Sequence, residues 1–380
     1  MSKFNRGGRA EAEASLVRLS VPGKVILMGE HAAVYGRPAV VAAVGLRLAV
    51  EARSNPTGGG RIRLDLPDLR LQEEHSWLAL EDFTNRARGR WCRFEAGDAP
   101  FRPADDRSAL VRIAVGEAAA SLPPAVSEQL RRRGLELRLR SQVPVGAGLG
   151  SSAAAAVGVV AAVRALAGKR VRSRNELAAI EAAALEVERR QHGFPSGIDS
   201  GTVLRGGVLL VRREGNRLRF DDLPRPEWLR GAVEILDSGT PSHTTGAVVT
   251  TVRRRYEEEP ERTAALFDRI EAAVESFRAA LRDGGPRDAA AAIADGHRAL
   301  VELGVVPPAV ARRIASVEAA GGAAKISGAG ALEGESAGAL ICMLAGRSAG
   351  TIDGISDLEP VNAAIGAGGL RFESPAADRL

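Results

Sequence analysis

The sequence predicts an α+β protein built from two domains. Its 380 residues exceed what one ordinary hydrophobic core holds and are enough for two domains with separate apolar interiors. Alternating, strand-like stretches and stretches with helical periodicity occur in both halves of the chain. A proline-bearing segment at residues 223–228 is the predicted linker. We therefore expect domains at 1–224 and 225–380, with a cleft between them.

The first half should hold most of a β-sheet and several helices. Strands are predicted at 16–19, 39–52, 134–141 and 206–211, with a further buried strand, near a bend, in the Val-Pro-Gly-Lys-Val-Ile-Leu run. Helices are predicted at 108–122, 152–167 and 174–190, a turn at 55–60, and a partly helical insertion at 71–103. A strand, a glycine-rich loop and a helix N-terminus therefore follow one another in the middle of the chain.

The second half alternates between the two periodicities. Strands are predicted at 232–236, 323–326 and 339–344, and helices at 245–256, 262–281, 288–303 and 309–320. This pattern favours an α+β domain here as well.

Composition excludes several classes of function. Cys92 and Cys342 stand far apart and in no metal-ligand spacing, which argues against a disulfide framework or a zinc site. The net charge of +5 comes from basic residues interleaved with acids, so we expect no nucleic-acid partner. The apolar run at 153–163 is too short to span a bilayer. We therefore expect a soluble cytoplasmic protein with no membrane partner.

Lysine is rare in this chain. Of 52 basic residues, the lysines are Lys3, Lys24, Lys169 and Lys325. Two of them, Lys24 and Lys325, lie inside glycine-containing motifs. A compact ammonium and a planar guanidinium are not equivalent beside a phosphate or a reacting hydroxyl, so lysine can be chemically required there. The alternative is an ordinary surface lysine.

The strongest local motif is the run Pro-Val-Gly-Ala-Gly-Leu-Gly-Ser-Ser that begins at Pro144. Glycines let the backbone approach an anion closely, and the helix that follows offers free N–H groups, which together suit a phosphate chain. The pattern matches neither a Walker A loop nor a dinucleotide fingerprint. The predicted cofactor-binding residues here are Pro144, Gly146, Ala147, Gly148, Leu149, Gly150, Ser151 and Ser152. A tight strand-to-helix turn is the alternative.

Two further segments carry polar residues in glycine-rich surroundings. The first runs from Glu188 to His192-Gly-Phe-Pro-Ser-Gly-Ile-Asp199, where a turn presents an acid that can serve as a base or simply cap the turn. The second, residues 20–36, places Lys24, Glu30 and His31 on a strand and the loop after it. Taken alone, neither segment decides a function.

Together, these motifs resemble those of the GHMP kinases. The similar segments are 22–36, 144–154, 192–199 and 324–330, so the resemblance extends over nearly the whole chain. Within that superfamily, the Gly29-Glu-His-Ala-Ala-Val-Tyr-Gly and His192-Gly-Phe-Pro-Ser-Gly-Ile-Asp runs look like those of the mevalonate kinases. Galactokinases normally place an aspartate two residues after the Glu-His pair, and this chain does not.

The resemblance implies a fold and a reaction. The fold would be an N-terminal α+β domain with a left-handed βαβ crossover and a ferredoxin-like C-terminal domain. The reaction would be ATP-dependent phosphorylation of the primary C5 hydroxyl of mevalonate, with Mg²⁺ as the metal. A homodimer is also implied.

The resemblance further assigns roles by matching position. Asp199 resembles the catalytic aspartate and Lys24 the lysine that contacts it and the substrate hydroxyl, while Ser152 and Glu188 resemble magnesium ligands. Lys325 and Gly328 match nucleotide-side positions, and the substrate-side positions are Glu30, His31, Ser196, Thr244 and Ala329. The chain departs from the family after Gly330, where Glu333 and Glu335 would repel a triphosphate unless they point away.

Two other functions stay open at this stage. The chain could be a related GHMP member that acts on a different small alcohol, or on phosphomevalonate or mevalonate diphosphate. The last two would need extra cations around the substrate phosphate. It could also be a silent homologue that binds nucleotides or RNA. The joint presence of Lys24, Ser152, Glu188 and Asp199 argues against the second alternative.

Overall fold

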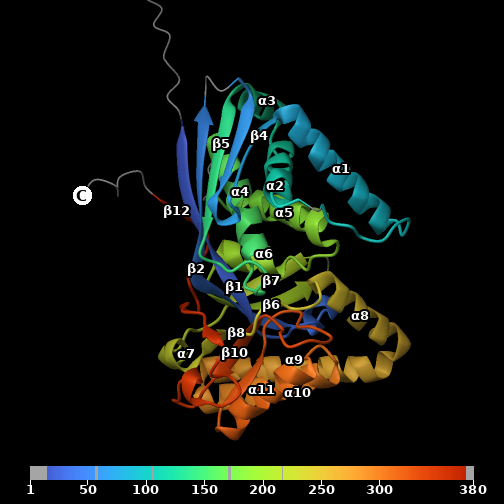
Figure 1. Cartoon of the computed structure of the whole chain (residues 1–380), viewed down its shortest axis with the longest axis vertical. Coiled ribbons are helices and arrows are strands. Elements are labelled where there is room, and N and C mark those ends of the chain that lie inside the picture. Colours follow the sequence, from blue (N-terminus) through green and yellow to red (C-terminus); the bar gives the residue numbers. More distant parts are fainter. Residues whose placement is uncertain (1–14, 56–58, 105, 170–172, 216, 374–380) are drawn as a thin grey trace, which may run out of the picture.

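The structure is a computed structural model that describes residues 15–55, 59–104, 106–169, 173–215 and 217–373. These residues form two α+β units, one above the other in Figure 1. The described strands form a sheet of eight in the upper unit and a sheet of four in the lower unit. The predicted α+β class is confirmed.

The sheet of the upper unit has the order β12-β1-β2-β5-β3-β4, and β6 pairs with β2 and β7. Its strands are β1 (Leu16–Met28), β2 (Ala39–Asn55), β3 (Arg61–Leu66), β4 (Leu71–Ser76), β5 (Gly134–Ser141), β6 (Val208–Glu214), β7 (Arg217–Asp222) and β12 (Arg371–Phe372). Strands β3 and β5 pair in parallel, whereas the other neighbours are antiparallel.

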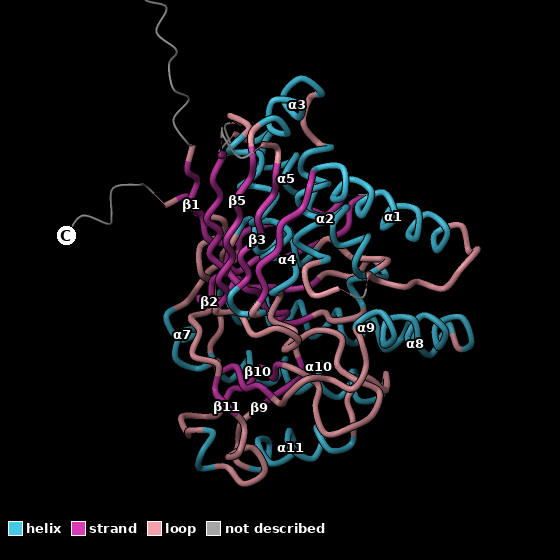
Figure 2. The backbone as a smooth tube through the Cα atoms, turned by 45° about the horizontal axis from the view of Figure 1, so that its top comes forward, coloured by secondary structure: helices cyan, strands magenta, loops and turns pink. Residues whose placement is uncertain are grey.

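Helices cover one face of this sheet, as Figures 1 and 2 show. They are α1 (Trp77–Glu95), α2 (Ala109–Ala120), α3 (Pro124–Arg132), α4 (Ser151–Leu166), α5 (Arg174–His192) and α6 (Ile198–Arg205). Helix α4 is buried on every side from residue 153 to residue 163, which explains why its sequence is apolar all round. Helices α2, α5 and α6 pack against it.

The lower unit has a sheet of order β11-β8-β10-β9, antiparallel throughout. Its strands are β8 (Glu234–Asp237), β9 (Ala323–Ile326), β10 (Ala339–Met343) and β11 (Glu359–Pro360). Its helices are α7 (Glu227–Ala232), α8 (Thr245–Glu258), α9 (Pro260–Arg282), α10 (Pro286–Glu302) and α11 (Pro308–Ala319). The fourth-first-third-second strand order, with helices after the first strand, is that of a ferredoxin-like domain.

The two units share a hydrophobic core. Strands β1 and β2 extend beyond the upper sheet, and Val25 and Val40 pack in one cluster with Phe277 of α9 and Ile341 of β10. The chain also returns to the upper unit at its end, where β12 pairs with β1. The start of β1 and the end of β2 therefore lie in the core of the upper unit, whereas the end of β1 and the start of β2 lie in the core that both units share. The division of the chain at residue 224 stays a prediction.

The elements differ from the expected ones in a few places. Strand β1 runs unbroken through Pro22, because a register shift between Pro22 and Gly23 relieves the pairing that proline cannot make. The segment predicted as an insertion is strand β4 followed by the regular helix α1. Elements β3, α3, α6, β7, α7, β11 and β12 were not predicted. Of the predicted turn at 55–60, residues 56–58 lie outside the described residues.

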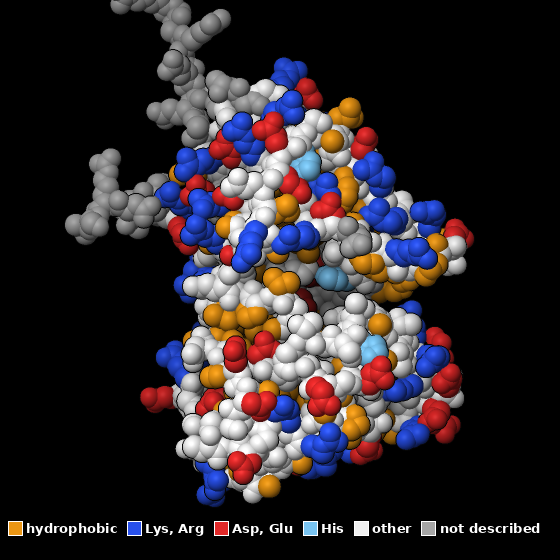
Figure 3. Space-filling view, in the orientation of Figure 1, with side chains coloured by type: hydrophobic (Ala, Val, Ile, Leu, Met, Phe, Trp, Pro, Cys, Tyr) orange, Lys and Arg blue, Asp and Glu red, His pale blue; other side chains and the backbone are white. Residues whose placement is uncertain are grey.

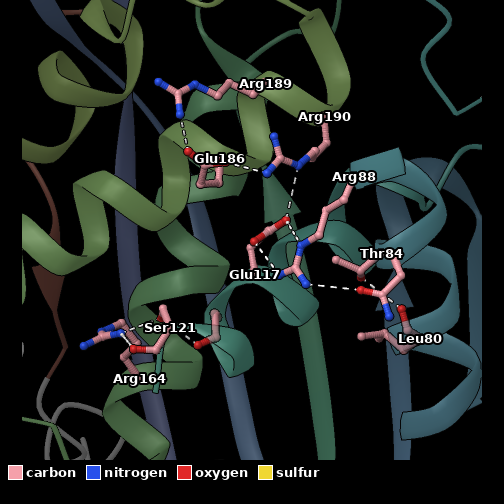
Figure 4. Close-up of polar contacts among 11 residues, drawn as sticks. Leu80, Thr84, Arg88, Glu117, Ser121, Arg164, Glu186, Arg189 and Arg190 are labelled. Carbon is pink, nitrogen blue, oxygen red and sulfur yellow. Dashed lines mark hydrogen bonds and ion pairs between the residues drawn. The ribbon is translucent and has the colours of Figure 1, made fainter. Parts of the chain in front are cut away.

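A buried ion-pair network joins three helices of the upper unit (Figure 4). The Glu117 carboxylate on α2 accepts two hydrogen bonds from Arg88 on α1, at 2.9 and 2.8 Å, and lies 3.5 Å from Arg190 on α5. The Trp91 ring of α1 lies 4.7 Å from the Arg190 guanidinium. Because buried charges need partners at close range, this network fixes the C-terminal end of α5 against α1 and α2.

Candidate active site

The glycine-rich loop alternates between buried and exposed residues. Ala147 and Leu149 are buried in the core shared by the two units, whereas Gly146 and Gly148 are exposed. Gly146, Gly148 and Gly150 have φ angles of +84°, +75° and +80°, which side-chain-bearing residues rarely adopt. The apolar side chains thus anchor the loop and turn its glycine backbone toward solvent.

Backbone hydrogen bonds hold this loop between the two units. The Lys24 N–H of β1 donates to the Leu149 carbonyl at 2.8 Å, and the Ala339 N–H of β10 donates to the Ala147 carbonyl at 3.0 Å. A Cβ at Gly23 would lie 2.8 Å from the Leu149 oxygen, so glycine is needed there for the approach. The loop is therefore fixed from both sides.

An ion pair lies beside the end of this loop. The Lys24 ammonium is 3.1 Å from the Asp199 carboxylate, and the Lys24 side chain is 5% exposed while that of Asp199 is 38% exposed. The Lys24 stem packs against Gly150, where a Cβ would lie 2.6 Å from Cγ of the lysine. Asp199 stands in the first turn of α6, two residues after the N-cap residue Gly197, whose φ angle is +79°. A buried cation thus meets a carboxylate that solvent can reach.

A second carboxylate lies close to this pair. Glu188 of α5 is 4% exposed, and burial together with the nearby charge of Asp199 raises its pKa to about 8. The Ser200 hydroxyl donates to Glu188 at 3.3 Å. The Ser152 hydroxyl, at the start of α4, is hydrogen bonded to Nε2 of His192 at 2.9 Å. The structure therefore brings together the predicted residues of three sequence segments.

The residues predicted to bind magnesium have suitable chemistry for it. Magnesium prefers oxygen ligands and usually keeps several waters or phosphate oxygens, so one carboxylate and one hydroxyl from the protein suffice. The buried Glu188 carboxylate carries an energetic cost that a bound cation would relieve. Among the described residues, no group of three or more His, Cys, Asp or Glu side chains could hold a metal ion. Glu188 and Ser152 thus fit a metal held jointly with a phosphate chain.

Another polar cluster lies where the lower unit meets β1. The Lys325 ammonium of β9 pairs with the Glu30 carboxylate, and their side chains are 0% and 1% exposed. The His31 ring is hydrogen bonded to the Ala329 carbonyl at 2.9 Å, and burial lowers the pKa of His31 to about 4. His297 of α10 is also buried, and burial together with the charge of Lys325 lowers its pKa to about 4.

The remaining predicted residues lie in loops and at the starts of helices. Thr244 caps α8 by accepting a hydrogen bond from the Ala247 N–H at 3.3 Å, and the Ser196 hydroxyl accepts one from the Ile198 N–H at 3.2 Å. Pro144, Ser151 and Gly328 are half-buried. Glu333 and Glu335 are exposed, and the Glu333 carboxylate is 4.0 Å from His243. The pKa of Arg313 is raised chiefly by its hydrogen bonds to Asp357 and to a smaller extent by the charge of Glu335.

Sequence reasoning assigned no role to three residues that shape the site. His192 is hydrogen bonded to Ser152. Its place in the same sequence motif as Asp199 was the signal that could have pointed to a role for it. The Ser327 hydroxyl accepts a hydrogen bond from the Ile26 N–H at 2.9 Å. The Trp91 indole of α1 donates to the Gly193 carbonyl at 2.9 Å, so the segment predicted as an insertion supports the turn that leads to Asp199. The last two contacts join distant segments, and no local pattern predicts them.

Figure 3 shows the surface hollowed between the upper and lower units, with acidic and histidine side chains inside the hollow. The ion pairs and the glycine loop described above lie at this junction. In the described part of the chain, no helix combines the length and apolar character needed to cross a membrane.

Known proteins are similar to this chain in sequence. A family model described as "GHMP kinases N terminal domain" matches residues 113–207. A mevalonate kinase of Thermococcus sibiricus is 33% identical over 264 residues, which are 69% of this chain and 69% of that protein. A mevalonate kinase of Pyrococcus furiosus is 30% identical over 319 residues, or 82% of this chain and 85% of that protein.

Solved structures are similar in fold. The crystal structure of the Methanococcus jannaschii mevalonate kinase superposes with a TM-score of 0.71 and covers 95% of this chain and 99% of its own. The sequence identity is 21%. This likeness extends over both units and confirms the two-unit fold that the sequence resemblance implied.

We expect buried His297 to make stability depend on pH. Its pKa in the folded chain is about 4, below the ordinary value of 6.5, so the unfolded chain takes up the proton first. Stability should therefore fall as the pH falls from about 6.5 toward about 4, and His297→Leu should remove about 2 kcal/mol of the loss between pH 7.5 and pH 5. Urea unfolding at both pH values measures this.

The matched control is His243→Leu, which changes a histidine with a 24% exposed side chain. It should leave the loss of stability between the two pH values as in the unchanged chain. If the unchanged chain and His297→Leu lost equal stability between the two pH values, protonation of His297 would not be the cause of the loss.

Proposed function

The chain belongs to the mevalonate kinase family of GHMP kinases, and from that premise we propose that it transfers the γ-phosphoryl group of ATP to the primary C5 hydroxyl of mevalonate. The products would be 5-phosphomevalonate and ADP. Family membership makes the chain an ATP-dependent kinase. The identity of the acceptor is supported by the relatives, whose names are those of mevalonate kinases.

One observation carries the mechanism: the Lys24 ammonium lies 3.1 Å from the Asp199 carboxylate, next to the last glycine of the phosphate loop. Phosphoryl transfer needs a hydroxyl aligned with the γ-phosphate and positive groups that stabilise the charge that develops. A solvent-accessible carboxylate beside a buried cation supplies both a proton acceptor and a positive group that stabilises the developing negative charge.

We assign the steps as follows. Asp199 accepts the proton of the acceptor hydroxyl while the oxygen of that hydroxyl bonds to the γ-phosphorus. ADP leaves with the electron pair of the broken P–O bond. Lys24 stabilises the negative charge on the attacking oxygen. The N–H groups from Gly146 to Ser152 hold the phosphates at the N-terminus of α4. Ser152 and Glu188 would hold Mg²⁺, which supplies charge neutralisation to the phosphates when bound.

We assign the other predicted residues to the two substrates. Thr244, Ser196, His31 and Ala329 are assigned to the acceptor side, and Gly328 to the nucleotide side. The N-terminal end of α8 lies near the turn before Asp199, because a Cβ at Gly246 would be 3.9 Å from the His192 carbonyl. The homodimer and the cytoplasmic location stay predictions.

An assay of ADP release with ATP and magnesium tests the proposed acceptor. The panel consists of mevalonate, phosphomevalonate, mevalonate diphosphate, homoserine and galactose. We expect release that depends on mevalonate and on none of the others. Release with phosphomevalonate or mevalonate diphosphate instead would reassign the acceptor within the superfamily, and no release with any alcohol would refute the kinase mechanism.

Replacing the proton acceptor should remove turnover and spare nucleotide binding. We expect Asp199→Ala to lower kcat by about 100-fold or more, because a positioned acid-base group contributes on that scale. The Kd for ATP should stay close to that of the unchanged enzyme, as measured by calorimetry. The control is Asp353→Ala, at an exposed position of the lower unit, which should keep full activity. Near-normal turnover of Asp199→Ala would refute the assignment.

A further inference from the structure

The ion pair between Glu30 and Lys325 joins the two units at a place where no strands pair. Glu30 stands two residues after the end of β1 in the upper sheet, whereas Lys325 belongs to β9 of the lower sheet. The Lys325 ammonium donates to one Glu30 oxygen and, at 2.7 Å, to the Ile326 carbonyl. Both side chains are within 1% of complete burial. Their polar atoms therefore have no surface to offer a substrate or a nucleotide.

Two further contacts lie beside this pair. The Ile26 N–H donates to the Ser327 hydroxyl, and the His31 ring is hydrogen bonded to the Ala329 carbonyl, each at 2.9 Å. Gly29 and Gly328 adopt φ angles of +100° and +97°, so both segments turn sharply here. Side chains, rather than a regular strand ladder, thus fix residues 26–31 against residues 325–329. We call this set of contacts the seam.

The charges at the seam connect it to the phosphoryl-transfer centre. Burial raises the pKa of Glu30, and this rise is opposed mainly by Lys325 and to a smaller extent by the charge of Lys24, which itself pairs with Asp199. The second oxygen of Glu30, Oε2, is buried and has no hydrogen-bond partner among the described residues. A buried carboxylate without a counter-ion is costly, so Glu30 deprived of Lys325 would attract Lys24, the other lysine whose charge acts on it.

We propose that Lys325 and Glu30 are positioning residues: Lys325 neutralises Glu30 across the seam, which leaves Lys24 directed at Asp199 and holds residues 327–329 in place. This deepens the proposed phosphoryl transfer and rests on it. The assignment differs from what the family resemblance implies for these two residues, namely a substrate contact for Glu30 and a nucleotide contact for Lys325. It makes their effects unequal, because only the loss of Lys325 creates a competing carboxylate.

The test compares Lys325→Met, Glu30→Gln and the double variant in steady-state kinetics with mevalonate and ATP. Lys325→Met should lower kcat at least about tenfold, because a misplaced catalytic group costs on that scale or more. Glu30→Gln should stay within about threefold of the unchanged enzyme, and the double variant should recover to the same level. Lys169→Met, at a half-buried lysine beyond the end of α4, is the matched control and should behave as the unchanged enzyme.

Recovery of activity in the double variant is the outcome that a direct contact cannot produce. If Glu30 contacted the substrate, Glu30→Gln would lower kcat as much as Lys325→Met does. If Lys325 touched the nucleotide, the double variant would stay as inactive as Lys325→Met and its KM for ATP would rise. Either result would overturn the proposal.

A second measurement does not depend on the identity of the substrate. Hydrogen exchange of the segments 24–31 and 324–331 should be faster in Lys325→Met and return to the original rate in the double variant. Unchanged exchange in the single variant would refute the seam. An unchanged protein that does not phosphorylate mevalonate would refute the proposed function, while the exchange rates would still decide whether Lys325 and Glu30 hold the two units together.

Discussion

The position of the Lys24 ammonium is the constraint on which the rest of the site depends. Its backbone N–H is held by the glycine loop, its stem packs where Gly150 has no side chain, and its charge lies 3.1 Å from Asp199. The segments around Lys24, Gly150 and Asp199, the first and last of which are more than a hundred residues apart in the sequence, therefore meet at one side chain. A planar guanidinium on a branched head would not fill this space in the same way, which accounts for a lysine in a chain that otherwise uses arginine.

The length of β1 extends this constraint to the whole molecule. The strand begins in the upper sheet, passes the glycine loop at Gly23 and Lys24, and ends in the core that includes α9 and β10. Glu30, at its end, is buried against Lys325 of the lower unit. Along β1 and the residues that follow it, the chain thus contacts first the phosphate loop, through Lys24 also Asp199, and then the lower unit at the seam. The relative placement of these three parts follows from the geometry of that strand.

The sequence predicted the parts of this site whose chemistry is local. The glycine loop, the helix that follows it and the turn before Asp199 depend on residues that are neighbours in the chain, so their patterns were informative. The contacts of Lys325 with Glu30 and of Trp91 with Gly193 join residues 295 and 102 positions apart. Only the folded chain brings them together, and the short helix α6 carries too few turns for a clear period. The continuous course of β1 through Pro22 likewise needed a register shift that no propensity predicts.

The most direct test of this account asks whether Gly150 matters because of Lys24. Gly150→Ala should lower kcat at least about tenfold, since its Cβ would displace the lysine stem. Gly168→Ala, at a similar φ of +76° but with no atom within 4 Å of the added Cβ, controls for backbone strain and should be active. In the Lys24→Ala background, the account predicts that adding Gly150→Ala costs no further activity. A further loss of similar size in the double variant would contradict it.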